Sequence, residues 1–240
     1  KQGGKSWYFL TADYAFGHQL QADTTKVVEA NGGKVVGSVR APLNASDFSS
    51  FLLQAQGSKA QILGLANAGG DTINSIKAAN EFGITKTMKL AGLLVFINDI
   101  HSLGLKTTQN MYLTDSWYWN HTPETRAWAR KFFDKVKRMP SSLQAADYSA
   151  TTQYLNAVKA VGTDDAEKVL AHMKQAKFND VFMKNGYVRA DGRVIHDMYL
   201  MQVKTPEKST EPWDYYNVVQ VFKGEEAWTT KAESKCPLWK

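Results

Sequence analysis

The side chains that enzymes most often use for catalysis are scattered along this sequence. Its five histidines occur singly, without the spacing of a metal-binding motif, and no Gly-x-Ser-x-Gly sequence marks a nucleophilic serine. Paired acids such as Asp164 and Asp165 are adjacent at expected helix starts, where carboxylates are solvated. We therefore expect no catalytic residues, no metal site and no cofactor.

A glycine-rich stretch follows one of the expected strands. It reads Gly-Leu-Ala-Asn-Ala-Gly-Gly from Gly64, without the Gly-x-Gly-x-x-Gly spacing or the Gly-Lys-Ser/Thr ending of nucleotide-binding loops. We predict no nucleotide site there. Free backbone N–H groups at the start of the following helix remain able to hold a carboxylate or hydroxyl group of a small ligand.

Aromatic side chains occur where loops are expected. Tyr14 and Phe16 share one loop, and Trp117, Tyr118 and Trp119 come directly after an expected strand. Rings at such places either line a cleft or pack in the core. The sequence leaves both alternatives open.

The composition is that of a globular protein. The chain has 240 residues, 43% of them hydrophobic and 22% charged, and 29 basic against 23 acidic residues give a net charge of +6. Lysines and arginines are dispersed, so we expect no nucleic-acid partner. Cys236 is the single cysteine, which excludes a disulfide within this chain.

Strands and amphipathic helices alternate in the first half of the chain. The expected strands are residues 7–10, 35–39, 62–65, 88–90 and 111–113. The intervening helices have expected starts at Ser46 or Asp47 and at Asp71, and expected ends at Gly33 and Gly83. This alternation predicts an α/β fold with a parallel sheet, whose carboxyl edge carries the loops 13–16, 67–71 and 93–98.

The alternation stops after residue 114. Thr122 and Pro123 predict the start of a helix to about residue 138, a second helix runs from about residue 145 to Gly162, and Asp164 with Glu167 predicts a capping box for a third. Turns are expected at residues 186 and 191–192, and strands at residues 198–203 and 216–222.

Five short sequences together resemble one family. They are Asp-Tyr-Ala-Phe-Gly at residues 13–17, Asn-Gly-Gly-Lys-Val-Val at 31–36, Asp-Phe-Ser at 47–49, Ile-Lys-Ala-Ala-Asn-Glu-Phe-Gly at 76–83 and Ala-Ala-Asp-Tyr-Ser-Ala at 145–150. In this order they are similar to the branched-chain amino acid type of ABC-transporter substrate-binding protein. The resemblance implies a type I periplasmic-binding-protein-like fold, with one doubly wound lobe of parallel sheet and part of a second lobe.

The resemblance also implies a division of the chain. Residues 1–114 would form the core of the second ligand-binding lobe, residues 115–190 would belong to the first lobe, and residues 191–240 would return to the second. Members of the family begin with a further segment that builds most of the first lobe. We therefore expect a truncated chain that exposes apolar surface, and Cys236 could pair with a cysteine of that segment.

The family's ligand contacts map onto three loops of this sequence. The aromatic residue before the glycine of the first helix is Phe16, and the position after the third strand is Ala68, beside Asn67. The acidic residue that binds the ligand's ammonium group in amino-acid binders aligns near Leu94, beside Leu93. A buried ammonium group without a carboxylate partner is costly, which argues against an α-amino acid.

The expected ligand is instead an apolar or aromatic carboxylate. The expected site residues are Tyr14, Phe16, Asn67, Ala68, Leu93, Leu94, Trp117 and Tyr148, with Asn67 as a hydrogen-bonding group.

The expected function is solute capture between two lobes in the periplasm and delivery to an ABC permease in the membrane. Partners would be the small-molecule ligand, the permease, and the missing N-terminal segment or another chain. The alternatives are a ligand-sensing domain of a receptor or regulator, a binder of branched-chain amino acids, and an α/β enzyme.

Overall fold

The computed structural model describes residues 3–239 and contains two compact units. The first unit comprises residues up to Thr114 together with Met201–Asn217, and the second comprises Asp115–Leu200 and the residues from Val218 on. The chain therefore passes between the units after residues 114, 200 and 217.

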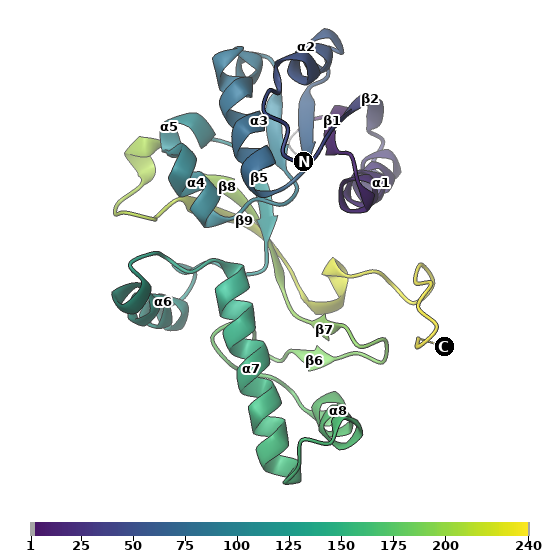
Figure 1. Ribbon diagram of the computed structural model, residues 1–240, viewed down its shortest axis with the longest axis vertical. Helices are drawn as coiled ribbons and strands as arrows, with labels where there is room; N and C mark the ends of the chain where they lie inside the picture. The colour runs from purple at the N-terminus through teal and green to yellow at the C-terminus, as the bar shows by residue number, and fades with distance from the viewer. Residues whose placement is uncertain (1–2, 240) are drawn as a thin grey trace. The chain divides into compact units, whose positions relative to one another are not determined.

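The first unit is a parallel sheet with helices on both faces (Figure 1). Its strands are β1 (Ser6–Ala12), β2 (Lys34–Ala41), β3 (Ile62–Ala66), β4 (Lys89–Gly92) and β5 (Tyr112–Asp115). Its helices are α1 (Ala15–Ala30), α2 (Ser49–Gly57), α3 (Gly69–Glu81), α4 (Ile97–Leu103) and α5 (Leu105–Thr108). Strand β1 pairs in parallel with both β2 and β3, and the β3–β4 and β4–β5 pairs are parallel as well.

Two later strands extend the sheet. They are β8 (Met198–Val203) and β9 (Tyr216–Phe222), and the order of the seven strands is β2-β1-β3-β4-β5-β8-β9. The predicted ranges of β8 and β9 match, and the mostly parallel α/β architecture confirms the predicted fold class.

The second unit is mainly helical. It contains α6 (Pro123–Val136), α7 (Ser142–Val161) and α8 (Ala166–Gln175), followed by a two-stranded hairpin of β6 (Tyr187–Val188) and β7 (Val194–Ile195). Short 3₁₀ helices in the chain are Ile84–Lys86, Pro206–Lys208 and Gly224–Ala227. The three consecutive helices and the turn at residues 191–192 were predicted correctly.

The core of the first unit lies along β1 and β3. Phe9 and Leu10 of β1 and Leu63 and Leu65 of β3 are fully buried. Consecutive buried side chains are typical of parallel strands that are covered on both faces. A buried apolar layer therefore supports the strands whose carboxyl ends form the sheet edge.

Several predicted helix starts were wrong. Phe48 is the N-cap of α2, because the carboxylate of Asp47 accepts the N–H of Ser49 at 2.8 Å, which forms a turn just before the helix; Ser46 is not the cap either. Asp71 lies inside the first turn of α3, where it accepts the N–H of Asn44 at 3.1 Å.

Two further starts in the second unit differ by one to a few residues. Helix α7 begins at Ser142, because Ser141 and Gln144 form a capping box before it. The N-cap of α8 is Asp165, one residue beyond the predicted Asp164, since its carboxylate accepts the N–H of Lys168 at 3.1 Å.

The two compact units divide the end of the chain differently from the predicted domains. Residues 191–200 and those after 217 group with the helical unit, whereas the sequence placed residues 191–240 with the sheet. The reason is local bonding: Asp197 accepts hydrogen bonds from Lys223 and Gly224, and Glu225 binds Arg189. The assignment of these units to the lobes of the family stays a prediction.

Among residues 3–239, no helix is both long and apolar enough to span a bilayer.

Gly17 allows the close contact between α1 and the end of β1. A Cβ atom at this position would lie 2.1 Å from the carbonyl oxygen of Ala12. We expect Gly17→Ala to lower the free energy of unfolding by roughly 1–3 kcal/mol, measured by urea denaturation. Gly57→Ala is the matched control, because a Cβ there meets no atom within 4 Å; equal effects of the two substitutions would contradict this account.

Candidate functional site

The candidate site lies at the carboxyl edge of the sheet in the first unit. In the strand order β2-β1-β3-β4, the chain leaves β1 toward β2 and leaves β3 toward β4. These two connections run in opposite directions across the sheet. Helices α2 and α3 pack together, and Figure 1 shows α1 apart from them. Open α/β sheets bind ligands outside the carboxyl ends of the strands at such a reversal of strand order. The loops after β1 and β3 meet this condition.

Tyr14 and Phe16 form an aromatic pair after β1. Their ring centroids are 5.6 Å apart, Tyr14 is 42% exposed and Phe16 is half-buried. Tyr14 is the N-cap of α1, and no side chain caps this helix or places an acid in its first turn. The N–H groups at this helix start thus lie beside two rings and favour negative charge.

Asn67 and Ala68 follow β3 on the neighbouring strand. Asn67 is 1% exposed, and its carboxamide accepts the Thr72 hydroxyl at 2.8 Å and donates to the Ser75 hydroxyl at 3.0 Å. This side chain therefore holds the start of α3 from inside. Ala68 is the N-cap of α3, half-buried and without a side-chain cap.

Leu93 and Leu94 follow β4. Both are half-buried, and the N–H of Leu93 donates to the carbonyl of Leu65 at 3.3 Å, which fixes the loop against β3. The next helix starts with Asp99 accepting the N–H of Phe96 at 2.9 Å. The structure thus places six predicted site residues, on three loops, at one sheet edge.

The acids near this edge are already engaged. Asp13 lies 2.7 Å from His18 Nε2 and 3.7 Å from Arg40 of β2. Asp71 is 5% exposed and is bonded to the N–H of Asn44. An ammonium group at this edge would compete with these partners, whereas a carboxylate would meet open helix N–H groups.

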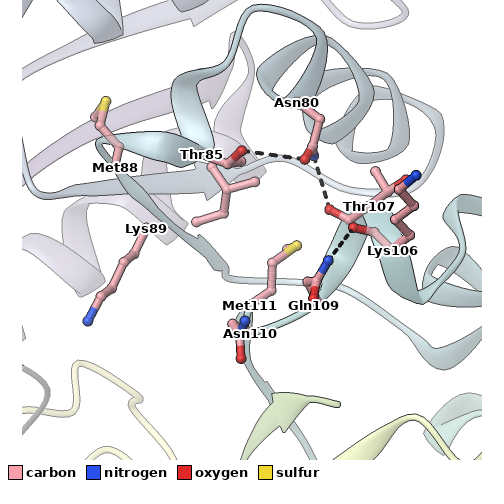
Figure 2. A pocket seen from close by; sticks show the side chains of 10 residues that line it. Asn80, Thr85, Met88, Lys89, Lys106, Thr107, Gln109, Asn110 and Met111 are labelled. Carbon is pink, nitrogen blue, oxygen red and sulfur yellow. Dashed lines mark hydrogen bonds between the residues drawn. The ribbon is translucent and has the colours of Figure 1, made fainter. Parts of the chain in front are cut away.

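A separate cavity of about 240 Å³ lies at the opposite edge, where β4 and β5 begin (Figure 2). The Asn80 amide donates to the carbonyls of Ile76 and Thr107 there. Figure 2 shows the ammonium groups of Lys89 and Lys106 pointing away from each other and from the middle of the cavity. The two ammonium groups therefore do not point to a common place where an anion could bind.

The two remaining predicted residues, Trp117 and Tyr148, are in the second unit. Trp117 is 3% exposed and donates its indole N–H to the carbonyl of Val181 at 2.9 Å. Its ring packs edge-on against Trp128, which also contacts Tyr148, with centroids 5.7 and 5.3 Å apart. Trp117 therefore belongs to the interior of that unit, while Tyr148 is 48% exposed.

Asp115 is a perturbed group that the sequence did not reveal. It is 6% exposed at the end of β5, and burial raises its pKa to about 7 although Ser142 and the N–H of Ser116 hydrogen-bond it. Ser142 lies 27 positions further along, so only the fold brings the two together. No local sequence signal marks this burial.

No cluster of metal-ligating side chains occurs within the described residues. Among the histidines, His101 is held by aromatic residues: its ring stacks on Trp213 with centroids 3.7 Å apart and is hydrogen-bonded to the hydroxyl of Tyr215 at 2.7 Å.

Taken together, these features define a class: α/β ligand-binding proteins with a parallel sheet and a second, helical unit joined by several chain crossings. A family model described as “Periplasmic binding protein” matches residues 1–210. The chain belongs to this periplasmic binding protein family.

Two solved structures are similar to this chain over its whole length. A periplasmic binding protein from Burkholderia mallei is 67% identical with a TM-score of 0.97, and a branched-chain amino acid ABC transporter periplasmic ligand-binding protein from Burkholderia xenovorans LB400 is 41% identical with a TM-score of 0.89. Each match covers 100% of this chain and 64% of the other. This chain therefore spans 64% of the length of either structure.

A more distant likeness shows the fold alone. It is the solute-binding protein of an ABC transporter from Rhodopseudomonas palustris BisB5, solved with 3,4-dihydroxybenzoic acid, at 20% identity and a TM-score of 0.81 over 98% of this chain and 62% of that one. A search of curated proteins finds no match.

The raised pKa of Asp115 predicts a pH-dependent stability. Between pH 3.8 and about 7 the folded state binds more protons than the unfolded state, so stability falls as pH rises through this window. We expect Asp115→Asn to match the wild type near pH 4 and to be roughly 1–3 kcal/mol more stable at pH 8. Denaturation at both pH values measures this.

The control is Asp134→Asn on the exposed side of α6. A gain for Asp115→Asn that is the same at both pH values, or a loss at pH 8, would contradict a buried carboxyl with a raised pKa.

Proposed function

We propose that this chain is part of the solute-binding component of an ABC importer, which captures a small apolar or aromatic carboxylate and delivers it to a membrane permease. The observation that carries the proposal is the Tyr14–Phe16 pair beside the uncapped start of α1, at the strand-order reversal of a periplasmic-binding-protein sheet. Leu93 and Leu94 add apolar surface at the same edge. Capture between two lobes is part of the proposal.

The proposed ligand carries a carboxylate and no ammonium group. The segment from Leu93 to Asn98 has no acid, and Asp13 and Asp71 are bound by protein partners. The Rhodopseudomonas palustris protein was solved with an aromatic acid, and that shared fold is compatible with such a ligand. The xenovorans relative is described as a branched-chain amino acid transporter protein, which makes leucine the competing ligand.

The proposed location is periplasmic, and the proposed role is binding without catalysis. Support comes from the family, whose description is that of periplasmic binding proteins. A sensor domain with the same fold would bind the ligand equally well. The importer and sensor roles differ in whether ligand-bound protein stimulates ATP hydrolysis by a reconstituted permease.

We also propose that the helical unit is completed by a further polypeptide segment. Leu143, Ala150 and Tyr154 lie along one side of α7 and are exposed, Leu143 to 51% and Tyr154 to 44%, with the exposed Asp147 among them. Exposed apolar stripes of this kind mark interaction surfaces. The proposed occupant is the part of the protein that the longer relatives contain in addition to the matched 64%.

Ligand binding at the sheet edge is tested by thermal shift with benzoate, hexanoate and leucine, because a ligand that binds only the folded state raises Tm. We expect the carboxylates to raise Tm and leucine to raise it less. Phe16→Ala should raise the Kd for benzoate roughly tenfold, through lost apolar contact.

The control is Phe82→Ala. Phe82 is 42% exposed at the other end of α3, so its loss should leave the Kd unchanged. Stabilisation by leucine alone would refute the ligand class, and equal effects of the two substitutions would refute the site.

The α7 surface predicts self-association of the isolated chain. We expect sedimentation velocity to show concentration-dependent oligomers, and Leu143→Gln with Tyr154→Gln to shift the chain toward monomer, because the exposed stripe loses its apolar character. A monomeric wild type at high concentration would contradict an uncovered interface.

A further inference from the structure

The helical unit contains a cavity of its own. Its volume is about 170 Å³, and all its lining residues belong to the second unit. The walls come from the segment before α6, the first turn of α6, the loop at residues 180–184, the start of β8 and the residue after β9. The sheet edge of the first unit contributes nothing to it.

One wall is held rigidly. The carboxylate of Asp180 accepts the hydroxyl of Ser149 at 2.6 Å, the amide of Gln153 at 2.8 Å and two backbone N–H groups of its own loop. Trp117 donates its indole N–H to the carbonyl of Val181 in the same loop. Burial alone would raise the pKa of Asp180, but the four hydrogen bonds that its carboxylate accepts together lower it, so the carboxylate stays ionised and its oxygens are occupied. Asp180 therefore shapes the cavity without offering a free charge.

The other charges on the lining are paired. Lys184 lies 2.7 Å from Glu124, and Lys223 lies 2.6 Å from Asp197, which also accepts the N–H of Gly224 at 3.0 Å. Lys184, Glu124 and Lys223 are more than half exposed, so water screens both pairs and each contributes little. A neutral ligand leaves both pairs in place, whereas a charged ligand finds no unpaired opposite charge on the described lining.

His121 and Tyr199 supply uncommitted polar groups. His121 is exposed and Tyr199 is half-buried, and their rings are 4.9 Å apart. Among the described residues neither side chain has a hydrogen-bond partner, so both polar groups face water when no ligand is bound. Desolvation and the nearby charge of Lys223 lower the pKa of His121 despite the opposing effect of Asp197, which favours the neutral imidazole. It then has one acceptor nitrogen and one donor. The Tyr199 hydroxyl can donate and accept.

We propose that this cavity is a second ligand site, which binds a neutral single-ring aromatic alcohol of the phenol type. The ligand hydroxyl would donate to the free imidazole nitrogen of His121 and accept the hydroxyl of Tyr199, while its ring packs against Phe182 and Trp117. A cavity of about 150 Å³ suffices for benzene, so the volume of about 170 Å³ is of the right size for one substituted ring. This site goes beyond the carboxylate site proposed at the sheet edge.

The test uses phenol itself as the probe, with binding to the whole chain measured by ligand-observed NMR at pH 7. We expect phenol to bind, and benzoate to compete weakly because its charge has no unpaired cation in this cavity. Tyr199→Phe keeps the ring and removes one hydrogen bond, so the Kd for phenol should rise about 3–10-fold. His121→Phe should have a similar effect.

Tyr154→Phe is the matched control, since Tyr154 is exposed on α7 and outside the cavity. It should leave the Kd for phenol unchanged, as should Phe16→Ala. The proposal is overturned if phenol does not bind, if both cavity variants bind it like the wild type, or if Phe16→Ala abolishes binding. Benzoate binding that depends on Phe16 is a separate readout, so the two sites can fail independently.

Discussion

The chain leaves β1 and β3 toward opposite sides of the sheet, and the candidate site depends on this divergence. It opens the carboxyl edge between two neighbouring strands, so that the starts of α1 and α3 and the loop after β4 border one place. The approach of α1 to β1 is possible because residue 17 is glycine. Two rings and uncapped helix N–H groups are thereby brought to the edge, and both favour an apolar acid.

Electrostatics distinguish the two proposed sites. At the sheet edge the nearby carboxylates are held by His18, Arg40 and the N–H of Asn44. The start of α1 has no side-chain cap and no acid in its first turn, so negative charge on a ligand is favoured there. In the helical unit the lysines on the cavity lining are paired with Glu124 and Asp197, and Asp180 is held by hydrogen bonds. The described lining groups without a hydrogen-bond partner, His121 and Tyr199, carry no fixed charge. The same chain thus offers an anion-favouring edge and a cavity suited to an uncharged ring.

The sequence predicted what depends on local patterns. The strand and helix alternation, the stop of α7 at Gly162 and the three consecutive helices follow from hydrophobic periodicity and glycine, and the structure confirms them. Helix starts were missed where a carboxylate bonds outside the expected position, as for Asp47 and Asp71. The burial of Asp115 and the His121–Tyr199 pair depend on residues far apart in sequence, which no local pattern encodes.

The most direct test of the central claim is a benzoate titration followed by backbone amide NMR. If a carboxylate binds at the strand-order reversal, the largest shifts will occur at the N–H groups of Ala15 and Phe16 and in the loop after Asn67. Shifts confined to the opposite sheet edge, around Asn80 and Lys106, or the absence of shifts at α1, would contradict the account.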